Sequence, residues 1–324
     1  MATDMSDAKA GLAHFPVTLF ASSMGLWGWA LASFAMAAVW PAFMPVALVL
    51  RVVATVAFVG LVLIYGAKLI RAPHDCRAEW QVPGKLAFFP AISISMLLVA
   101  MGYLQDAPGM ARVIWVIGLA FQGLLTLSVI SSWISHRSFE VGQLSPAWFI
   151  PAVGNVIVPV AGVPLGYIEL SWLFFSGGVL FWLVLLTLVM NRLVFHDPLP
   201  GKLVPTLVVL IAPPALGFLA YVTLTGGVDS FARVLLNAAY IFAMLVVIQL
   251  PKLVTMPFAL SWWALSFPVA GLCMASIRFG VEAASPAHMV IGAGLWAVLS
   301  GIVAFLTAKT LRGLFAGVFF QPER

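Results

Sequence analysis

The sequence has little charge. Of its 324 residues only 8% are Asp, Glu, Lys or Arg, whereas a soluble domain has about 25%. Hydrophobic residues make up 63%, more than a water-soluble fold can bury. This balance excludes a soluble enzyme and indicates an integral membrane protein.

The sequence also lacks the usual signs of metal or enzyme sites. Cys76 and Cys273 lie far apart, so we expect no disulfide framework. The five histidines show no metal-ligand spacing, and no glycine-rich phosphate loop is present. No apolar run combines a nucleophile with a histidine and an acid. We therefore expect no metal, no cofactor and no enzymatic activity. The basic residues flank apolar runs instead of forming a stripe with aromatics, so we expect no nucleic-acid partner.

Long apolar runs are abundant, and most can cross a hydrocarbon layer about 30 Å thick as helices. They do not alternate as barrel strands would. Residues 1–14 lack the features of a signal peptide, so we take the whole chain as mature protein. The sequence predicts an all-α integral membrane protein, with residues 1–324 as one domain of ten transmembrane helices in five antiparallel hairpins. The expected spans are residues 15–36, 46–70, 87–104, 111–134, 148–164, 168–191, 203–224, 231–250, 259–279 and 287–311.

Basic residues are distributed unequally between the two sides of the predicted membrane. One side holds both termini and the links after spans 2, 4, 6 and 8. It carries Lys9, Lys68, Arg71, Arg77, Lys85, Arg137, Arg192, Lys202, Lys252, Lys309, Arg312 and Arg324, and the other carries Arg51, Arg112, Arg233 and Arg278. The positive-inside rule predicts a multi-pass protein of the cytoplasmic (inner) membrane with both termini in the cytoplasm.

Odd and even spans differ in composition. Each odd span carries a proline, at positions Pro16, Pro90, Pro151, Pro213 and Pro268, whereas the even spans are smoother and rich in Leu, Val, Phe and Trp. A proline that kinks a membrane helix is tolerated where protein or water satisfies the freed carbonyl. We therefore predict that the kinked odd helices face protein or a wet cavity and that the even helices face lipid. Five hairpin repeats can close into a ring around a central pore.

The predicted pore has a candidate gate and a candidate lining. Phe267 stands beside Pro268 on an inner helix, where a bulky ring could close the pore by steric block and dewetting. The alternative is one of 24 phenylalanines in an ordinary core. No charged residue lies deep in an odd span, which permits weak passage of anions without a tight binding site. The plausible polar lining is Thr18, Ser22, Ser93, Ser95, Asn155 and Ser266, whose alternative role is helix packing.

Short motifs along nearly the whole chain carry a resemblance to a known family. They are Phe15-Pro16-Val17-Thr18-Leu19-Phe20, Arg77-Ala78-Glu79-Trp80 with Pro83, Ile150-Pro151-Ala152-Val153, Leu173-Phe174-Phe175 with Gly177, Val228-Asp229 with Ala232, and Trp263-Ala264-Leu265-Ser266-Phe267. In order and spacing they resemble the family of the tellurite-resistance protein TehA, the plant slow anion channels and the malate/C4-dicarboxylate transporters.

The resemblance implies a ten-helix channel for small anions with quasi-five-fold hairpin symmetry. It also implies a homotrimer in the lipid bilayer with one pore in each subunit. In this family a phenylalanine on the ninth helix plugs the pore, and the matching residue here is Phe267. Pro268 follows it where tellurite-resistance members can have glycine, so helix 9 is expected to flex differently.

Three hypotheses for the function follow. The first is a passive anion channel gated by Phe267. The second is a secondary transporter that exports C4-dicarboxylates such as malate, or tellurite. The third is a membrane scaffold or sensor without transport, which would need a reporting domain. A proton-coupled pump is disfavoured because no ionisable residue clearly lies within a span. The residues do not identify the transported ion.

Overall fold

The structure is a computed structural model that describes residues 11–135 and 139–318. Lys9, Arg137 and Arg324, which contribute to the charge asymmetry, lie outside these residues. The described part contains helices and no strands. Nine of its helices are long and apolar enough to cross a membrane, and a tenth apolar stretch, Pro146–Gly162, is shorter. These findings confirm the prediction of an all-α multi-pass membrane protein.

Four of the odd spans combine a 3-10 segment with α-helix, and the span of residues 83–103 joins two α-helices. The odd spans consist of η1 (Val17–Leu19) with α2 (Phe20–Val39), α5 (Pro83–Leu86) with α6 (Pro90–Tyr103), η4 (Pro146–Trp148) with α8 (Phe149–Val156) and α9 (Val158–Gly162), η5 (Gly201–Ile211) with α11 (Ala212–Thr225), and η6 (Leu260–Leu265) with α13 (Ser266–Glu282). The even spans are long α-helices. They are α3 (Met44–Arg71) after η2 (Pro41–Phe43), α7 (Pro108–Ser135), α10 (Ile168–Phe195), α12 (Ser230–Leu253) and α14 (Pro286–Phe315). Two short elements, α4 (Pro73–Trp80) and η3 (Val141–Gln143), lie in links.

Burial separates the two sets of spans. In the four long odd spans 72 to 83% of the most apolar stretch is buried, against 17 to 39% in the even spans. Every residue of α8 in the short fifth span is also buried. The large exposed side chains of the even helices are mainly Val, Leu, Ile and Phe, as a lipid-facing surface requires. The predicted division into inner and outer helices is therefore confirmed.

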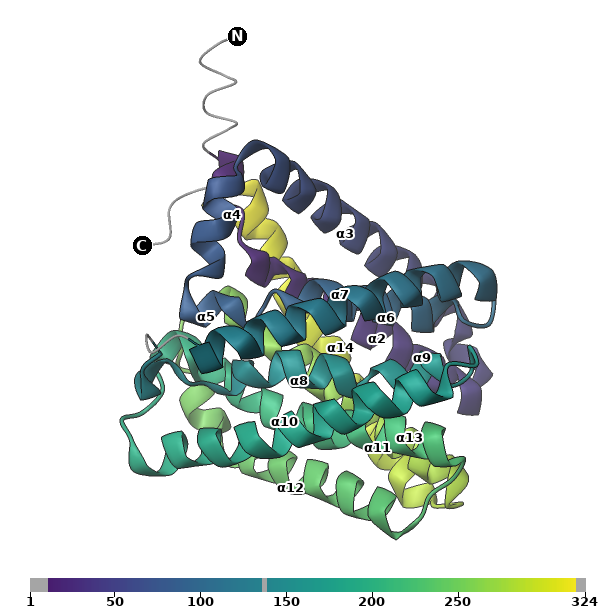
Figure 1. The fold of residues 1–324 in the computed structure, drawn as a ribbon. Helices are drawn as coiled ribbons and strands as arrows, with labels where there is room; N and C mark the ends of the chain where they lie inside the picture. Colours follow the sequence, from purple (N-terminus) through teal and green to yellow (C-terminus); the bar gives the residue numbers. More distant parts are fainter. Residues whose placement is uncertain (1–10, 136–138, 319–324) are drawn as a thin grey trace.

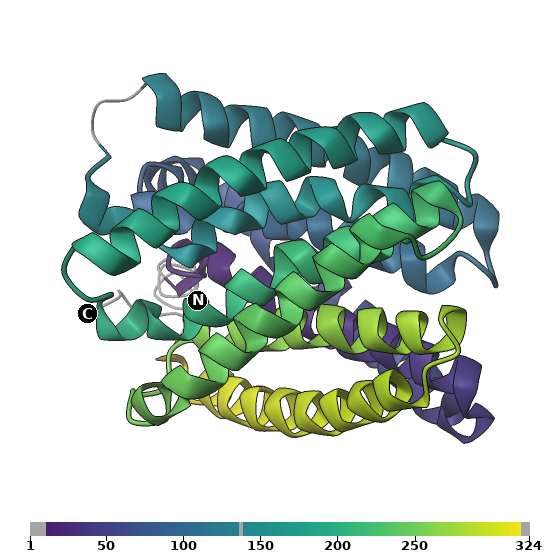
Figure 2. The same ribbon diagram turned by 90° about the horizontal axis from the view of Figure 1, so that it is seen from below.

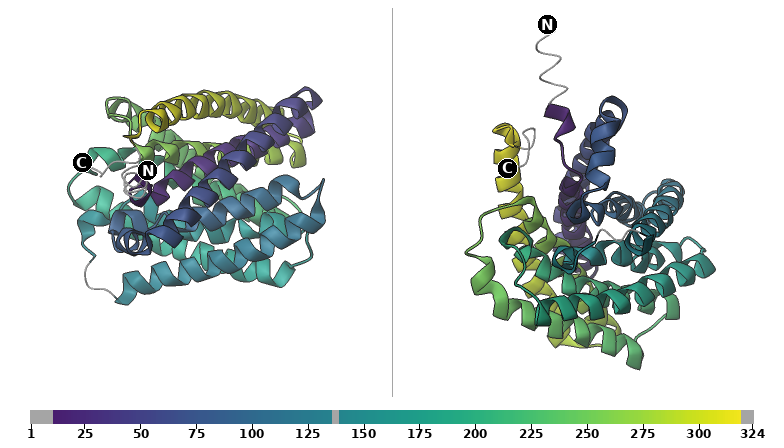
Figure 3. Two further views of the ribbon diagram at one scale, coloured as in Figure 1. Left: turned by 90° about the horizontal axis from the view of Figure 1, so that it is seen from above. Right: turned by 60° about the vertical axis from the view of Figure 1, so that its left-hand side comes forward.

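The inner helices contact one another in the cyclic order α2, α6, α8, α11 and α13, and α13 returns to α2. Figure 1 shows the outer helices α7, α10 and α12 running across the molecule one below another, with α8 between α7 and α10. Figure 2 shows the long α14, in yellow, along the edge of the molecule. The first span lies beside the last hairpin, since α2 contacts both α13 and α14 (Figure 3). The first span and the last hairpin thus lie side by side.

The five prolines singled out in the odd spans, one in each span, stand at the beginnings of helices. Pro16 directly precedes η1, and Pro90 is the first residue of α6. Pro213 is the second residue of α11, while Pro151 and Pro268 are the third residues of α8 and α13. A proline is tolerated in the first turn because its missing N–H is not needed there. In four of the odd spans a narrow 3-10 segment gives way to an α-helix, and before Pro90 a short turn separates α5 from α6.

A buried ion pair joins the beginning of the first inner span to the link after α3. Lys68 Nζ lies 2.9 Å from Glu79 Oε2 and also donates to the Phe15 carbonyl at 2.8 Å. Glu79 accepts hydrogen bonds from Val17 N at 2.8 Å and from the Tyr65 hydroxyl at 3.0 Å. Both charges are almost fully buried. The pair therefore fixes where the first inner span enters the membrane.

Replacing the buried carboxylate tests this anchor. Glu79→Gln leaves the Lys68 ammonium buried without a counter-charge, and we expect unfolding to become easier by about 3 kcal/mol. Thermal unfolding of the purified protein in detergent measures the change. The control is Asp106→Asn, which removes the partner of Arg51 where the carboxylate is 57% exposed and should cost under about 1 kcal/mol. Equal unfolding temperatures for the two variants would contradict the anchor.

Glycines allow α2 and α13 to approach closely. A Cβ atom added at Gly25 would lie 2.3 Å from Ser266 Oγ and 2.8 Å from the Trp263 ring. A Cβ atom added at Gly28 would lie 2.9 Å from the Cβ of Ala270. Small residues at such crossings are the common device by which membrane helices gain contact area. This crossing brings the first and ninth spans together beside the centre of the molecule.

An added methyl group tests the close approach. Gly25→Ala should destabilise the protein by about 1 to 3 kcal/mol, because the α2 and α13 backbones must separate to admit it. Gly60→Ala on α3 is the matched control, since nothing lies within 4 Å of the added atom. That variant should be as stable as the unmodified protein or slightly more stable. Circular dichroism melting curves that coincide for both variants would show that the helices do not touch there.

Candidate functional site

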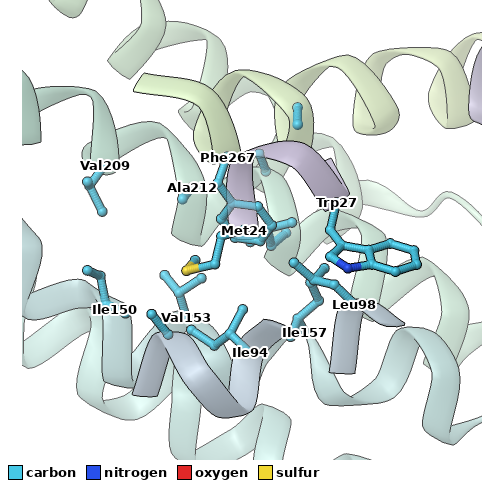
Figure 4. Close-up of a cluster of buried hydrophobic side chains, with 14 of the residues drawn as sticks. Met24, Trp27, Ile94, Leu98, Ile150, Val153, Ile157, Val209, Ala212 and Phe267 are labelled. Atoms are coloured by element: carbon cyan, nitrogen blue, oxygen red, sulfur yellow. The ribbon is translucent and has the colours of Figure 1, made fainter. Parts of the chain in front are cut away.

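The inner spans surround a small cavity. All five odd spans contribute to its wall, and the contributing side chains are apolar. Figure 4 shows buried side chains of the inner spans around this centre. They include Met24, Ile150, Val153, Val209, Ala212 and Phe267. The cavity thus lies where the prolines and the helix junctions gather.

Phe267 is the second residue of α13 and lines the cavity. Its side chain is 4% exposed. Gly28 of α2 lies directly behind it, because a Cβ atom added at Gly28 would come 3.4 Å from Phe267 Cδ2. The neighbouring wall residue Trp263 is fixed by a hydrogen bond from its Nε1 to Thr310 Oγ1 of α14 at 2.9 Å. The structure therefore places the predicted gate residue on the cavity wall, between fixed neighbours.

The predicted polar lining residues are not among those that form the cavity wall. Ser22, Ser93 and Ser266 each donate to the carbonyl three residues earlier, at 2.6 to 2.9 Å. Ser95 donates to the carbonyl four residues earlier, and Asn155 Nδ2 does the same toward the Pro151 carbonyl at 3.0 Å. These groups satisfy carbonyls in the first turns of the inner helices. Thr18, within η1, is half-buried.

A buried glutamine on an outer helix was not predicted from the sequence. Gln122 of α7 donates from Nε2 to the Pro151 carbonyl at 3.0 Å and to Thr126 Oγ1 at 2.9 Å. Its Oε1 accepts from Ser93 at 2.7 Å. The amide thus ties α7 to α6 and α8 beside the cavity. Its signal in the sequence is a lone amide in an apolar run, because such a group in a membrane helix seeks a partner on a neighbouring helix.

The cavity wall carries no ionisable side chain. Successive spans alternate in direction, so the five inner helices are parallel and their amino-terminal ends lie on one side. Those ends carry partial positive charge. No group of three or more His, Cys, Asp or Glu that could hold a metal ion occurs within the described ranges. The site can therefore admit a small anion, but it offers no fixed charge that would hold one tightly.

The comparisons with known proteins agree with this arrangement. The chain is 26% identical to the tellurite resistance protein TehA homolog of Haemophilus influenzae, over 94% of this chain and 92% of the relative. It is 23% identical to an uncharacterized transporter of Methanocaldococcus jannaschii, over 82% of this chain and 85% of the relative. It is 26% identical to the S-type anion channel SLAH3 of Arabidopsis thaliana, but this match covers 76% of the chain and only 39% of the plant protein.

A family model also matches most of the chain. The model described as voltage-dependent anion channel, SLAC1, matches residues 14–311. The matched range runs from the beginning of the first inner span into α14, so it includes all five odd spans and the cavity between them. The resemblance that the sequence motifs carry is thereby confirmed, and the chain belongs to the SLAC1 family of voltage-dependent anion channels.

Proposed function

We propose that this protein is a channel that conducts small anions across the cytoplasmic membrane. The observation that carries the proposal is the cavity to which all five inner spans contribute, with Phe267 on its wall. The inner helices form its wall, and the apolar outer helices separate it from lipid. Membership of the SLAC1 family supports the same function.

The electrostatics of the site favour anions of low hydration energy. No carboxylate on the cavity wall repels an anion, and no lysine or arginine there traps one. The parallel amino-terminal ends of the inner helices add a weak positive potential at one mouth. An ion that passes through a cavity with an apolar wall must shed water, so weakly hydrated anions pass most easily. The site therefore supports passage with little binding.

Phe267 is the proposed gate. Its ring is bulky and apolar, and it stands at the α13 junction where the cavity is bounded by Met24 and Ala212. A ring in this position closes a narrow apolar pore both sterically and by excluding water. Rotation of the side chain, or a shift of α13 at Pro268, would open the pore.

The proposal includes an arrangement in the membrane and an assembly. Both termini lie in the cytoplasm, on the side rich in lysine and arginine. The five hairpins form a quasi-five-fold ring, for which the cyclic contact order of the inner helices is the support. Three subunits assemble through the apolar faces of outer helices, each with its own pore. The outer helices expose many large apolar side chains.

Removing the proposed plug should open the channel. Phe267→Ala is expected to raise the anion conductance at least roughly tenfold, since both the steric block and the dewetting barrier fall. Current recordings from oocytes or from planar bilayers containing purified protein measure the effect. Several permeant anions should be compared in the same recordings.

Phe218→Ala on α11 is the matched control, because Phe218 is fully buried but does not line the cavity. It should leave conductance near the level of the unmodified protein when currents are normalised to protein in the membrane. Unchanged currents in Phe267→Ala for every anion, or equal increases in both variants, would refute the gate.

A secondary transporter for C4-dicarboxylates or tellurite is the second candidate. It is favoured by the relatives named as a transporter and as a tellurite resistance protein. In liposomes we expect chloride flux that rises in proportion to the driving force, without counterflow of labelled malate. Saturation together with malate or tellurite counterflow would replace the channel by a carrier.

A further inference from the structure

Trp27 carries a buried indole N–H for which the described part of the protein provides no acceptor. Three tryptophans, Trp27, Trp115 and Trp263, are among the largest fully buried side chains. Trp115 Nε1 donates to the Val158 carbonyl at 3.2 Å, and Trp263 Nε1 donates to Thr310. A buried donor without an acceptor is costly, so it calls for a functional explanation.

Trp27 lies at the level of the proposed gate. It follows the cavity residue Met24 by three positions on α2, and the next residue, Gly28, lies against Phe267. Figure 4 shows Trp27, Leu98 and Ile157 at the end of the apolar cluster opposite Ile150 and Val209. The three side chains thus form the next layer along the path that begins in the cavity.

The orientation of the indole is fixed. A Cβ atom added at Gly102 of α6 would lie 2.2 Å from Trp27 Cζ3, so this edge of the ring is pressed against α6. The Tyr103 ring packs on it edge to face, with centroids 6.1 Å apart. Nε1 is on the other edge of the indole, and in Figure 4 it faces the cluster of labelled side chains. The donor therefore points toward the proposed path and is held there by α6.

A second donor lies one helical turn away. Ser23 precedes Trp27 by four residues, which places both on the same side of α2. Ser23 is fully buried, and its Oγ has no hydrogen-bond partner within the described residues. In contrast, Ser22 and Ser33 on the same helix donate to backbone carbonyls. An anion that has left water needs hydrogen-bond donors. Two unpartnered donors on one side of an inner helix, within an apolar surrounding, can provide them.

We propose that the Trp27 N–H is a specificity-determining group that donates a hydrogen bond to a small monovalent anion, such as chloride, as the anion passes Phe267. This inference rests on the proposed channel function. A single strong donor in an apolar layer favours anions that accept hydrogen bonds well over anions that pass only because they lose water easily. Without Trp27 the apolar wall would select anions only by the free energy needed to remove their water. The Trp27 N–H adds selection by hydrogen-bond acceptor strength.

Ion selectivity tests the proposal in the conducting Phe267→Ala background. Adding Trp27→Phe removes the N–H and keeps an aromatic ring. The permeability of chloride relative to thiocyanate, taken from bi-ionic reversal potentials, should fall roughly threefold to tenfold. Trp115→Phe in the same background is the control, because it removes an N–H that is bonded to Val158, and it should leave the ratio unchanged. A ratio that is unchanged in Trp27→Phe, or that falls equally in both variants, would overturn the proposal.

Binding can be measured without conduction. In protein with an intact gate and ¹⁵N-labelled indoles, the signal that disappears in Trp27→Phe identifies the Trp27 N–H. Its proton resonance should move downfield as chloride replaces gluconate, which is too large to enter. A resonance that does not depend on the anion would mean that water occupies the donor, and the proposal would fail. If Phe267→Ala conducts anions while Trp27→Phe changes neither readout, the Trp27 assignment fails alone. If no variant conducts and the resonance is also unresponsive, the channel function fails with it.

Discussion

The need to satisfy every backbone N–H and C=O group away from water shapes this protein. Lipid offers no hydrogen bonds, so the exposed even spans are long α-helices that satisfy their own backbone. One 3-10 segment, η2, precedes α3 at the start of an even span, and the other junctions between 3-10 and α-helical segments lie in four of the buried odd spans. In the odd spans the hydroxyls of Ser22, Ser93 and Ser266 bond to carbonyls in the first turns. These polar side chains of the inner helices therefore form hydrogen bonds with the irregular backbone instead of facing the cavity.

The same constraint explains why the cavity wall is apolar. The serines and Asn155 are engaged by their own helices, and Gln122 holds the Pro151 carbonyl from outside the inner set. What remains to face the cavity is a set of Met, Ile, Val, Ala and aromatic side chains. Such a wall passes ions according to their cost of dehydration. Among the described residues seven buried side-chain donors have no hydrogen-bond partner, and two of them, Ser23 and Trp27, lie together on the inner helix α2.

Close helix contacts and a buried ion pair set the position of the first span. Gly25 and Gly28 allow α2 to lie against α13, which joins the first and last hairpins and seats Phe267. Lys68 and Glu79 hold the beginning of the same span at the Phe15 carbonyl and the Val17 N–H. The first inner span is thus tied both to the crossing with α13 and to the link after α3.

The sequence by itself determined the class of fold, the number of spans and their division into inner and outer helices. These features depend on local composition, since hydrophobic length and the spacing of proline are properties of single segments. Phe267 could be singled out because its motif matched a family. The sequence did not determine which side chains face the cavity, because rotation of each helix depends on its neighbours. Tertiary structure turned Ser22, Ser93 and Ser266 toward their own backbones, brought Lys68 to Glu79, and left the Trp27 indole N–H without an acceptor among the described residues. The physical reason is that hydrogen-bond partners of a buried group come from distant parts of the chain, and only the folded packing decides which of them are within reach.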